Sequence, residues 1–455
     1  MAPVSRRRFL AAGAAGAVGL MLDPIRALST TVPFAQPGFL AELITVTDRG
    51  FAAWWPTATA ADTTLRIARA DGGRVREYRL ERDRTVHVAA LDNLKPDTKY
   101  RYELWSGGQK MDRSPENPEL FRTLARPQGK RLATIAVLND MHVGERCSGT
   151  ITSLNGESYP PCFEGGDYAF RMTQAAIAEI RARDDVDFVL GNGDLTDRGR
   201  PGDITRSLDL FRTLQVPWRV TRGNHDRIFE GRDELRDQAF PEQSKDEHAL
   251  HWVERVGKRV GIVALDSCDP NTGDGRLDLE NQLAYLDATL TQLRTEGRNA
   301  IVAFHHHITP QANSTHPPPL VFGVRLDEGG EQCLEVLSRH AHVRLVLHGH
   351  THRNYLTYDA LSGPRLPFLE NGATKEYPGG YAIVRVYEDA IVRTFHRMTD
   401  DFCRQWVQTS AGQIYGMQPQ YTRGSLASRA FVHHFDATLP EPLPSIYGPI
   451  NLPQR

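Results

Sequence analysis

Residues 343–352, with the sequence VRLVLHGHTH, join an apolar run to a group of histidines. The apolar run at 343–347 predicts a buried strand. Gly349 permits a tight turn after that strand, and His350 and His352 follow it. Because side chains two positions apart in an extended chain point to the same side, we expect both imidazoles to face one point. Imidazole nitrogens bind borderline metal ions, so this stretch predicts part of a metal site.

Four other short motifs precede this one, and each also lies at the end of an apolar run. They are Asp140-Met141-His142, Gly193-Asp194-Leu195-Thr196-Asp197, Gly223-Asn224-His225-Asp226 and His305-His306-His307. Each motif alone is weak, because short polar groups of this kind arise by chance. Together they supply carboxylate, amide and imidazole ligands in about the number that two metal ions need.

Strand and helix patterns alternate through the same part of the chain. Buried-strand runs lie at 132–138, 188–190, 218–221, 260–265, 300–304 and 343–347, and helix patterns at 168–183, 204–214, 279–295 and 331–340. The helix pattern at 279–295 repeats leucine at three- and four-residue spacing, which indicates an amphipathic helix. Such alternation predicts an α/β domain, in which ligands bind at the carboxyl ends of the strands. The last runs, 380–387 and 390–397, have no helix between them and predict antiparallel pairing.

The segment at 39–123 has a different pattern, which predicts a small all-β domain. Short runs lie at 40–46, 50–55, 64–68, 76–80, 85–90 and 100–105, with turn residues between them. This even spacing predicts a β-sandwich. The stretch Leu94-Lys95-Pro96-Asp97-Thr98-Lys99-Tyr100 resembles the signature of fibronectin type III domains. The resemblance implies that Tyr100 is a corner tyrosine and that Trp54 or Trp55 is the core tryptophan; a carbohydrate-binding face is the alternative.

The N-terminus resembles a twin-arginine signal peptide. Ser5-Arg6-Arg7-Arg8-Phe9-Leu10 opens an apolar run that is too short to span a bilayer comfortably, and Ala27-Leu28-Ser29 offers a cleavage site. We therefore expect a bacterial protein that the twin-arginine machinery exports to the periplasm or beyond. A basic helix or an uncleaved anchor is the alternative. The predicted organisation is a signal at 1–29, a β-sandwich at 38–125, an α/β domain at 131–398 and an extension of unknown role at 399–455.

The composition and net charge of the chain limit the classes of partner that it is expected to bind. The chain has 455 residues, 40% of them hydrophobic and 24% charged, with a net charge of −2. This balance gives no general attraction to nucleic acid or to an anionic membrane, so no nucleic-acid partner is expected. None of the five cysteines has CxxC spacing. Cys147 and Cys162 are the favoured disulfide pair, and five unpaired thiols are the alternative.

The order of the five motifs, D-x-H, G-D-x-x-D, G-N-H-D, H and G-H-x-H, resembles the calcineurin-like metallophosphoesterase superfamily over about 132–397. The resemblance implies a four-layer α/β/β/α sandwich that holds two metal ions. Asp140, His142 and His352 would hold the first metal; Asn224, His305 and His350 would hold the second; and Asp194 would bridge them. His225 would contact the phosphate and protonate the leaving oxygen. Asp197 and Asp226 would orient these groups from outside the ligand set.

A β domain before such a site resembles purple acid phosphatases, but the motifs depart from theirs. Asp197 stands where those enzymes carry tyrosine, and His142 has no counterpart in their first motif. The site therefore resembles the colourless branch, which includes bacterial cyclic-nucleotide and glycerophosphodiester phosphodiesterases. The histidine run leaves the ligand open between His305 and His306; we favour His305, because it leaves the strand first. The ligand types suit Mn, Fe, Zn or Co.

The sequence thus predicts an exported phosphoesterase that cleaves mono- or diesters through a metal-bound hydroxide. A phospholipid or sphingolipid headgroup hydrolase is an alternative, suggested by the apolar Leu320-Val321-Phe322. A non-catalytic envelope protein with a structural metal site is another. Four residues are candidate substrate contacts, with surface ion pairing as the other interpretation of the two arginines: His306, Arg227, Arg222 and Tyr159.

Overall fold

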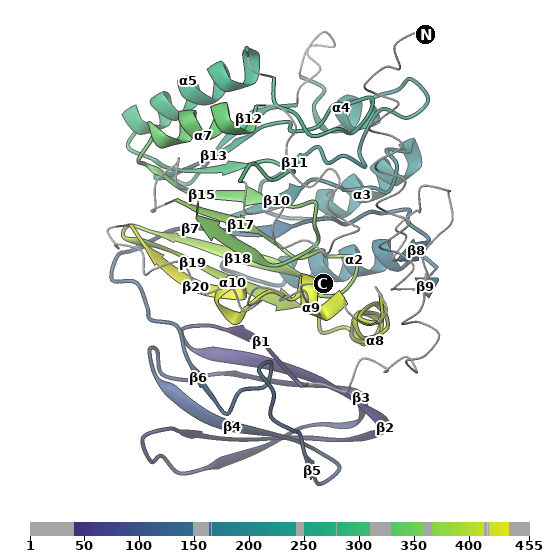
Figure 1. Cartoon of the computed structure of the whole chain (residues 1–455), viewed down its shortest axis with the longest axis vertical. Coiled ribbons are helices and arrows are strands. Elements are labelled where there is room, and N and C mark those ends of the chain that lie inside the picture. Colours follow the sequence, from purple (N-terminus) through teal and green to yellow (C-terminus); the bar gives the residue numbers. More distant parts are fainter. Residues whose placement is uncertain are drawn as a thin grey trace, which may run out of the picture.

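The computed structural model describes residues 41–148, 163–164, 166–242, 250–278, 280–309, 329–358, 366–413, 416 and 418–435. The predicted signal segment, Tyr159, Cys162 and the apolar residues 320–322 lie outside the described residues. Among the described residues, no helix has the length and apolar character needed to cross a membrane. Figure 1 shows the β domain at the bottom of the molecule and the α/β domain above it.

The N-terminal β domain consists of six strands in one hydrogen-bonded sheet. They are β1 (Glu42–Val46), β2 (Gly50–Arg69), β3 (Arg76–Asp92), β4 (Lys99–Ser106), β5 (Gln109–Lys110) and β6 (Leu120–Arg122). The runs predicted separately at 50–55 and 64–68 are one 20-residue strand, β2, and those at 76–80 and 85–90 are likewise one strand, β3. The pairing of β2 with β3 is irregular between Pro56 and Thr64, and such irregularities bend a strand without ending it.

The aromatic residues singled out in this domain are buried. Trp55 packs in the core of the β domain, and the hydroxyl of Tyr100 accepts a 2.9 Å hydrogen bond from the backbone N–H of Lys95. Trp54 faces the other way and packs with Phe395 of the α/β domain. Because all three rings are 4% exposed or less, they cannot form a carbohydrate-binding face. Assignment of this domain to the fibronectin type III family remains a prediction.

The α/β domain is built on two six-stranded sheets. The first has the order β11-β10-β7-β18-β19-β20, with β7 (Arg131–Leu138), β10 (Phe188–Asn192) and β11 (Trp218–Thr221) parallel. The other three strands, β18 (Gly380–Tyr387), β19 (Ala390–Arg397) and β20 (Ala430–His434), run antiparallel to their neighbours. The predicted antiparallel pairing of 380–387 with 390–397 is therefore confirmed. The second sheet contains β12 (Trp252–Val256), β13 (Val260–Ala264), β14 (Asn299–Ala303), β15 (Val343–His348), β17 (Pro367–Glu370) and β16 (Tyr355–Tyr358).

Alternate side chains of the second sheet point to its two faces, so one face packs against the first sheet and the other against helices. Ile262, Ile301 and Leu345 pack in the same core as the first sheet, whereas their neighbours Val263, Val302 and Val346 pack with the helices α5 (Asn281–Thr295) and α7 (Gly330–Ser338). On the first sheet, Phe211 of α3 (Pro201–Arg212) lies directly on Gly191 of β10. Helix α2 (Tyr168–Arg181) packs into the same core. The α/β class with a preceding all-β region is therefore confirmed.

Short elements complete the domain. They are β8 (Cys147–Ser148), β9 (Phe163–Glu164), α4 (Glu234–Ala239), α8 (Asp401–Ser410), α9 (Gln418–Thr422) and α10 (Leu426–Arg429). Cys147 is in a disulfide, whereas Cys268, Cys333 and Cys403 are free thiols. Asp400 precedes α8 as its N-cap, and its carboxylate accepts hydrogen bonds from the backbone N–H groups of Phe402 and Cys403.

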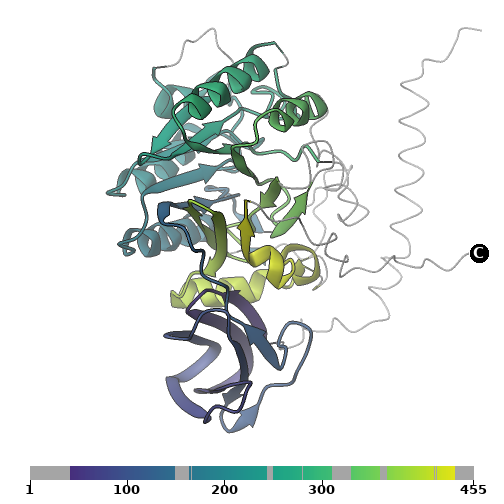
Figure 2. The same cartoon turned by 90° about the vertical axis from the view of Figure 1, so that its left-hand side faces the viewer.

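The β domain is joined to the α/β domain by apolar and charged contacts. Ile44, Trp54, Val86 and Val88 pack on Phe395 of β19. Beside them the buried carboxylate of Glu42 pairs with Arg397 at 2.8 Å and Arg423 at 3.0 Å and accepts a hydrogen bond from the hydroxyl of Tyr377. Figure 2 shows helix α8, in yellow-green, against the purple β domain.

Candidate metal centre

The five motifs meet at the carboxyl ends of strands from both sheets. Three of them follow β7, β10 and β11 of the first sheet, and two follow β14 and β15 of the second. Because these strands run parallel within each sheet, their carboxyl ends share one edge, where ligands of α/β proteins bind. The side chains brought together there are Asp140, His142, Asp194, Asn224, His225, His305, His350 and His352.

The backbone reaches this arrangement by a route that differs from the expected one. The sequence pattern predicts that Asp140 and His142, and likewise His350 and His352, lie two positions apart on an extended strand end. In the structure β7 ends at Leu138 and β15 at His348, and these four residues have φ angles of 50°, 44°, 77° and 58°. The backbone of Asp194 is also in the left-handed region, with a φ angle of 50°. The left-handed conformation is uncommon outside glycine and costs about 1–3 kcal/mol per residue, so the surrounding contacts must stabilise it at this edge.

Two motif glycines permit the close approach of these loops. Gly193 has a φ of 82°, and a side chain there would overlap the ring of His305. A side chain at Gly223 would overlap the backbone and the carboxylate of Asp194. Glycine therefore lets the second, third and fourth motifs approach one another more closely than any side chain would permit.

Two of the three clusters of ligand-type side chains share Asp194, and the third consists of His142, Asp197 and His225. The first contains Asp140, His142, Asp194 and His352, and the second contains Asp194, His305 and His350. Oδ2 of Asp194 lies 3.3 Å from Nε2 of His142 and 3.2 Å from Nε2 of His305. These are the groups that the family resemblance assigned to two metals, with Asp194 between them.

Asn224 adds an amide oxygen to the second cluster. Its Oδ1 lies 3.1 Å from Nε2 of His305 and 2.9 Å from Nδ1 of His350. Imidazole nitrogens and an amide oxygen that converge in this way can share one cation. His305, and not His306, thus faces both Asn224 and Asp194.

Charge and hydrogen bonding show that the first cluster fits a cation. Oδ2 of Asp140 and Nε2 of His142 are buried without a hydrogen-bond partner among the described residues. Burial, opposed by His352 and His305, raises the pKa of Asp140 to about 6. Buried carboxylates without sufficient positive charge are costly, and a cation held between these atoms would remove that cost.

The carboxylate of Asp194, which belongs to both clusters, also needs nearby positive charge to compensate its burial. Burial would raise the pKa of Asp194, but His305, His225 and His142 hold the pKa well below its usual value. Burial would lower the pKa of His305, yet Asp194 and Asp140 raise the pKa to about 9. In this structure imidazoles compensate the buried carboxylates, which is the role that bound cations would take over.

His225 lies at the open side of the clusters. Its side chain is 38% exposed, and its Nδ1 donates a 2.8 Å hydrogen bond to the backbone carbonyl of Asp197. Its backbone N–H donates to Oδ1 of Asp194. The carbonyl of Asp197 therefore orients His225, whereas the carboxylate of Asp197 lies 3.9 Å from Nδ1 and contacts Arg198.

Asp226 joins two of the motif loops from beneath. It is buried, and its carboxylate accepts hydrogen bonds from the backbone N–H groups of Leu195, Thr196 and Gly223. Burial, with the charge of Asp194, raises the pKa of Asp226 to about 6. The position fits the orienting role that the sequence suggested.

The four residues predicted to contact substrate differ in their exposure to solvent where the structure describes them. The prediction for Arg222 is wrong, because its side chain is fully buried and pairs with Asp233 at 2.8 Å and Asp266 at 2.9 Å. His306 is buried against Ser267, and its ring packs on that of His350. Arg227 is exposed and donates to the carbonyl of Thr272. Tyr159 lies outside the described residues.

Sequence reasoning missed a layer of buried charges behind the first cluster. Glu376 lies 2.7 Å from Nδ1 of His352, and Lys375 pairs with Glu145 at 2.5 Å and with Glu376 at 3.2 Å. Glu370 accepts from the N–H of Thr351. The available signal was the adjacent Lys375 and Glu376 in a short segment between two buried strands, where isolated charges are uncommon.

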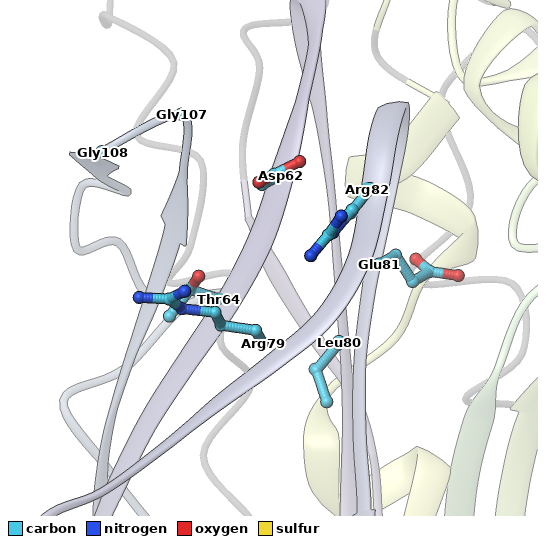
Figure 3. A pocket seen from close by; sticks show the side chains of 8 residues that line it. All are labelled: Asp62, Thr64, Arg79, Leu80, Glu81, Arg82, Gly107 and Gly108. Atoms are coloured by element: carbon cyan, nitrogen blue, oxygen red, sulfur yellow. The ribbon is translucent and has the colours of Figure 1, made fainter.

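A cavity of about 370 Å³ lies in the β domain and not in the α/β domain. Its lining residues are Asp62, Thr64, Arg79, Leu80, Glu81, Arg82, Gly107 and Gly108. Figure 3 shows Glu81 pointing toward the pale yellow helix, and its carboxylate pairs with Arg404 of α8 at 2.8 Å. The cavity therefore contains none of the motif residues.

Comparison with known proteins places the clusters in a family context. Residues 133–354 match the family model of calcineurin-like phosphoesterases. Over 175 residues the chain is 31% identical to a probable cyclic nucleotide phosphodiesterase of Synechococcus sp.; the match covers 37% of this chain and 59% of that protein. Over 249 residues it is 27% identical to a 3',5'-cyclic adenosine monophosphate phosphodiesterase of Pseudomonas aeruginosa, covering 52% of this chain and 84% of that protein.

Among solved structures, a dimetal phosphatase from Danio rerio aligns with 60% of this chain and 98% of its own, at 16% identity and a TM-score of 0.47. The segment that matches the family model, residues 133–354, contains both clusters, from Asp140 to His352. Residues 133–354, the part of the chain that holds both clusters, are therefore similar to the calcineurin-like phosphoesterase domain.

Proposed function

We propose that the protein is a dinuclear metal-dependent phosphoesterase that acts on phosphodiesters. The observation that carries this proposal is the pair of ligand clusters sharing Asp194 at one sheet edge. Asp140, His142 and His352 would hold one cation, and Asn224, His305 and His350 the other. Two bound cations would neutralise the charge of a phosphoester and make a water acidic enough to act as a nucleophile near neutral pH.

The residues of the chain supply orientation and a proton. The 2.8 Å bond from Nδ1 of His225 to the carbonyl of Asp197 assigns a hydrogen to Nδ1, so a second proton would bind at Nε2. A protonated His225 can then donate from Nε2 to the leaving oxygen of the substrate. Its 38% exposed side chain lets a substrate reach that atom, and the backbone bond to Asp194 keeps the ring beside the clusters.

The preference for diesters is supported by the motifs and by the relatives. Asp197 in place of tyrosine separates this site from the purple acid phosphatases, and both sequence relatives described above are named as cyclic nucleotide phosphodiesterases. Cyclic nucleotides and glycerophosphodiesters are the substrate classes we propose. The headgroup-hydrolase alternative rested on residues 320–322, which lie outside the described residues.

We propose in addition that the protein is exported. The basic and apolar pattern at 1–29 supports this, and so does the disulfide at Cys147, since disulfides persist in oxidising compartments. Periplasmic fractionation of cells that produce the full chain tests the proposal. Replacement of Arg6, Arg7 and Arg8 by lysine should retain the protein in the cytoplasm, and unchanged export would contradict the twin-arginine route.

A panel of phosphoesters tests the proposed activity. The panel contains p-nitrophenyl phosphate, its bis ester, 3',5'-cyclic AMP and glycerophosphocholine, each with protein as purified, after chelation and after return of Mn or Zn. We expect diester cleavage that is lost on chelation and restored by metal, and that Asp194→Ala abolishes. Stoichiometric metal with turnover of no phosphoester would instead support the non-catalytic binding protein.

A further inference from the structure

The buried carboxylate of Glu376 contacts the ring of His352 on the nitrogen that faces away from the first cluster. Oε1 of Glu376 lies 2.7 Å from Nδ1 of His352, whereas Nε2 of His352 lies 3.8 Å from Oδ1 of Asp140. An ionised carboxylate only accepts hydrogen bonds, so Nδ1 carries the hydrogen and Nε2 presents its lone pair to the cluster. The contact thereby fixes the ring in the tautomer and orientation that can bind a cation.

The second oxygen of Glu376 is equally constrained. Oε2 accepts hydrogen bonds from Oγ of Ser148 at 2.5 Å and from Nε2 of Gln413 at 2.8 Å, and it lies 3.2 Å from Nζ of Lys375. Glu376 is 3% exposed. With both oxygens engaged, the carboxylate cannot rotate away from His352 without breaking several buried contacts, each of which is costly to lose.

The C-terminal extension supplies the frame for Glu376. Trp406 of α8 donates from Nε1 to the backbone carbonyl of Lys375 at 2.9 Å, and Ser410 accepts from the backbone N–H of Tyr377 at 2.9 Å. Together with the bond from Gln413, three consecutive residues, 375–377, are held by the segment at 406–413. This segment belongs to the region for which the sequence suggested no role.

Helix α8 is in turn held by the N-terminal β domain. Arg404 pairs with Glu81 of β3 at 2.8 Å, and Asp401 pairs with Arg84 of β3 at 2.8 Å. A series of contacts therefore runs from the β domain to α8, from α8 to the backbone of Lys375 and Tyr377 on either side of Glu376, and from Glu376 to His352. Every member of that series except Asp401 is at least half-buried.

We propose that Glu376 is the positioning residue of the metal-binding His352 and that the C-terminal extension, through Gln413 and α8, holds Glu376 in place. The extension is thus part of the support of the metal site. The proposal rests on the proposed function only in requiring that a cation occupies the first cluster.

Metal affinity of the full chain tests the proposal without reference to turnover. The metal-free protein is titrated with Mn²⁺ in competition with a chromophoric chelator, for the wild type and for Glu376→Gln. We expect Glu376→Gln to weaken one of two sites by about 10- to 100-fold and to leave the other as in the wild type, as losses of outer-shell partners do. Asp185→Asn is the matched control, since it also neutralises a largely buried carboxylate, which pairs with Arg385 at 2.7 Å and contacts none of residues 375–377. It should lower thermal stability while both Mn²⁺ affinities stay unchanged.

A second variant keeps the test valid if Glu376→Gln folds poorly because Lys375 loses part of its charge balance. Gln413→Leu leaves the charges intact and removes one bond to Glu376; we expect weakening of the same site by about fivefold, the effect of one hydrogen bond. Equal affinities in both variants and the wild type would overturn the positioning role. So would uniform weakening of both sites. A wild type that binds no Mn²⁺ would instead overturn the proposed function itself.

Discussion

The backbone N–H of His350 donates a 2.9 Å hydrogen bond to Oδ1 of Asp140, which ties the last metal motif to the first across 210 residues of sequence. Asp140 belongs to the first cluster and His350 to the second, so this bond links the two clusters independently of Asp194. Geometry at one cluster is therefore coupled to geometry at the other.

Replacement of Asp140 tests that coupling. Asp140→Asn keeps an oxygen that can accept from His350 but removes the charge from the first cluster. We expect bound metal to fall from two equivalents to about one, with diester turnover reduced by more than about 100-fold, since even outer-shell partners can cost that much. Metal analysis of the purified variant beside steady-state kinetics provides the measurement. Two retained equivalents and unimpaired turnover would remove Asp140 from the ligand set.

Gly223→Ala is expected to damage the site through steric overlap alone. A methyl group at Gly223 would overlap the backbone and the carboxylate of Asp194, so the loop must move. We predict a loss of about 1–3 kcal/mol in the free energy of unfolding, the usual penalty of overpacking, with a larger proportional loss of metal affinity. Gly202→Ala is the control, because nothing lies within 4 Å of a side chain at that position. Chemical denaturation and metal titration of the two variants separate the effects.

Arg222 and Arg227 make a contrasting pair. Arg222 is buried between Asp233 and Asp266, so Arg222→Gln should cost about 3–5 kcal/mol of stability by leaving buried charge uncompensated. Its KM should stay near that of the wild type at temperatures where the variant is folded. Arg227→Gln should leave the midpoint of urea unfolding unchanged and raise KM, because the exposed guanidinium is the candidate for a substrate contact. The reverse pattern would show that both assignments are mistaken.

Glu42 makes the junction of the two domains sensitive to acid. Burial alone would raise its pKa, but Arg397 and Arg423, with the hydroxyl of Tyr377, lower the pKa from 4.5 to about 2. Because the folded-state pKa is the lower one, the stabilisation is fully present above about pH 4.5 and is lost as the pH falls toward 2; it amounts to about 3 kcal/mol at neutral pH.

The comparison of wild type with Glu42→Gln isolates this contribution. Urea unfolding at pH 7 should show the wild type to be the more stable protein, and the difference should shrink steadily between pH 5 and pH 3. A difference that stays constant over that range would mean that Glu42 is not the group responsible.

The sequence was sufficient for the class of the fold and for the edge that carries the site. Apolar runs at 218–221, 380–387 and 390–397 agree with the observed strands at both ends. Because the strands that precede the motifs are parallel, the motifs lie at the same edge of the sheets. Asp194 therefore lies between His142 and His305. The motif spacing carried this information because each motif directly follows an apolar run.

Other features depend on contacts that a linear pattern does not contain. The left-handed backbone at Asp140 and His142 arises where loops of different motifs crowd together. The sequence pattern correctly predicted that these two side chains lie close together, but it predicted an extended backbone for them, which is wrong. Arg222 lies beside a motif, yet its partners Asp233 and Asp266 come from later segments and draw it into the interior. Glu376 contacts His352 and also accepts a hydrogen bond from Gln413, which lies 37 residues further along the chain.

Dependence of turnover on metal occupancy tests the central claim most directly. Metal-free protein is titrated with Mn²⁺ while the hydrolysis of bis-p-nitrophenyl phosphate and the bound metal are measured in the same samples. The two clusters that share Asp194 predict that turnover appears with metal, reaches its maximum at two bound equivalents, and is absent from Asp194→Asn at every concentration. Hydrolysis by the metal-free protein, or full turnover by Asp194→Asn, would contradict the account.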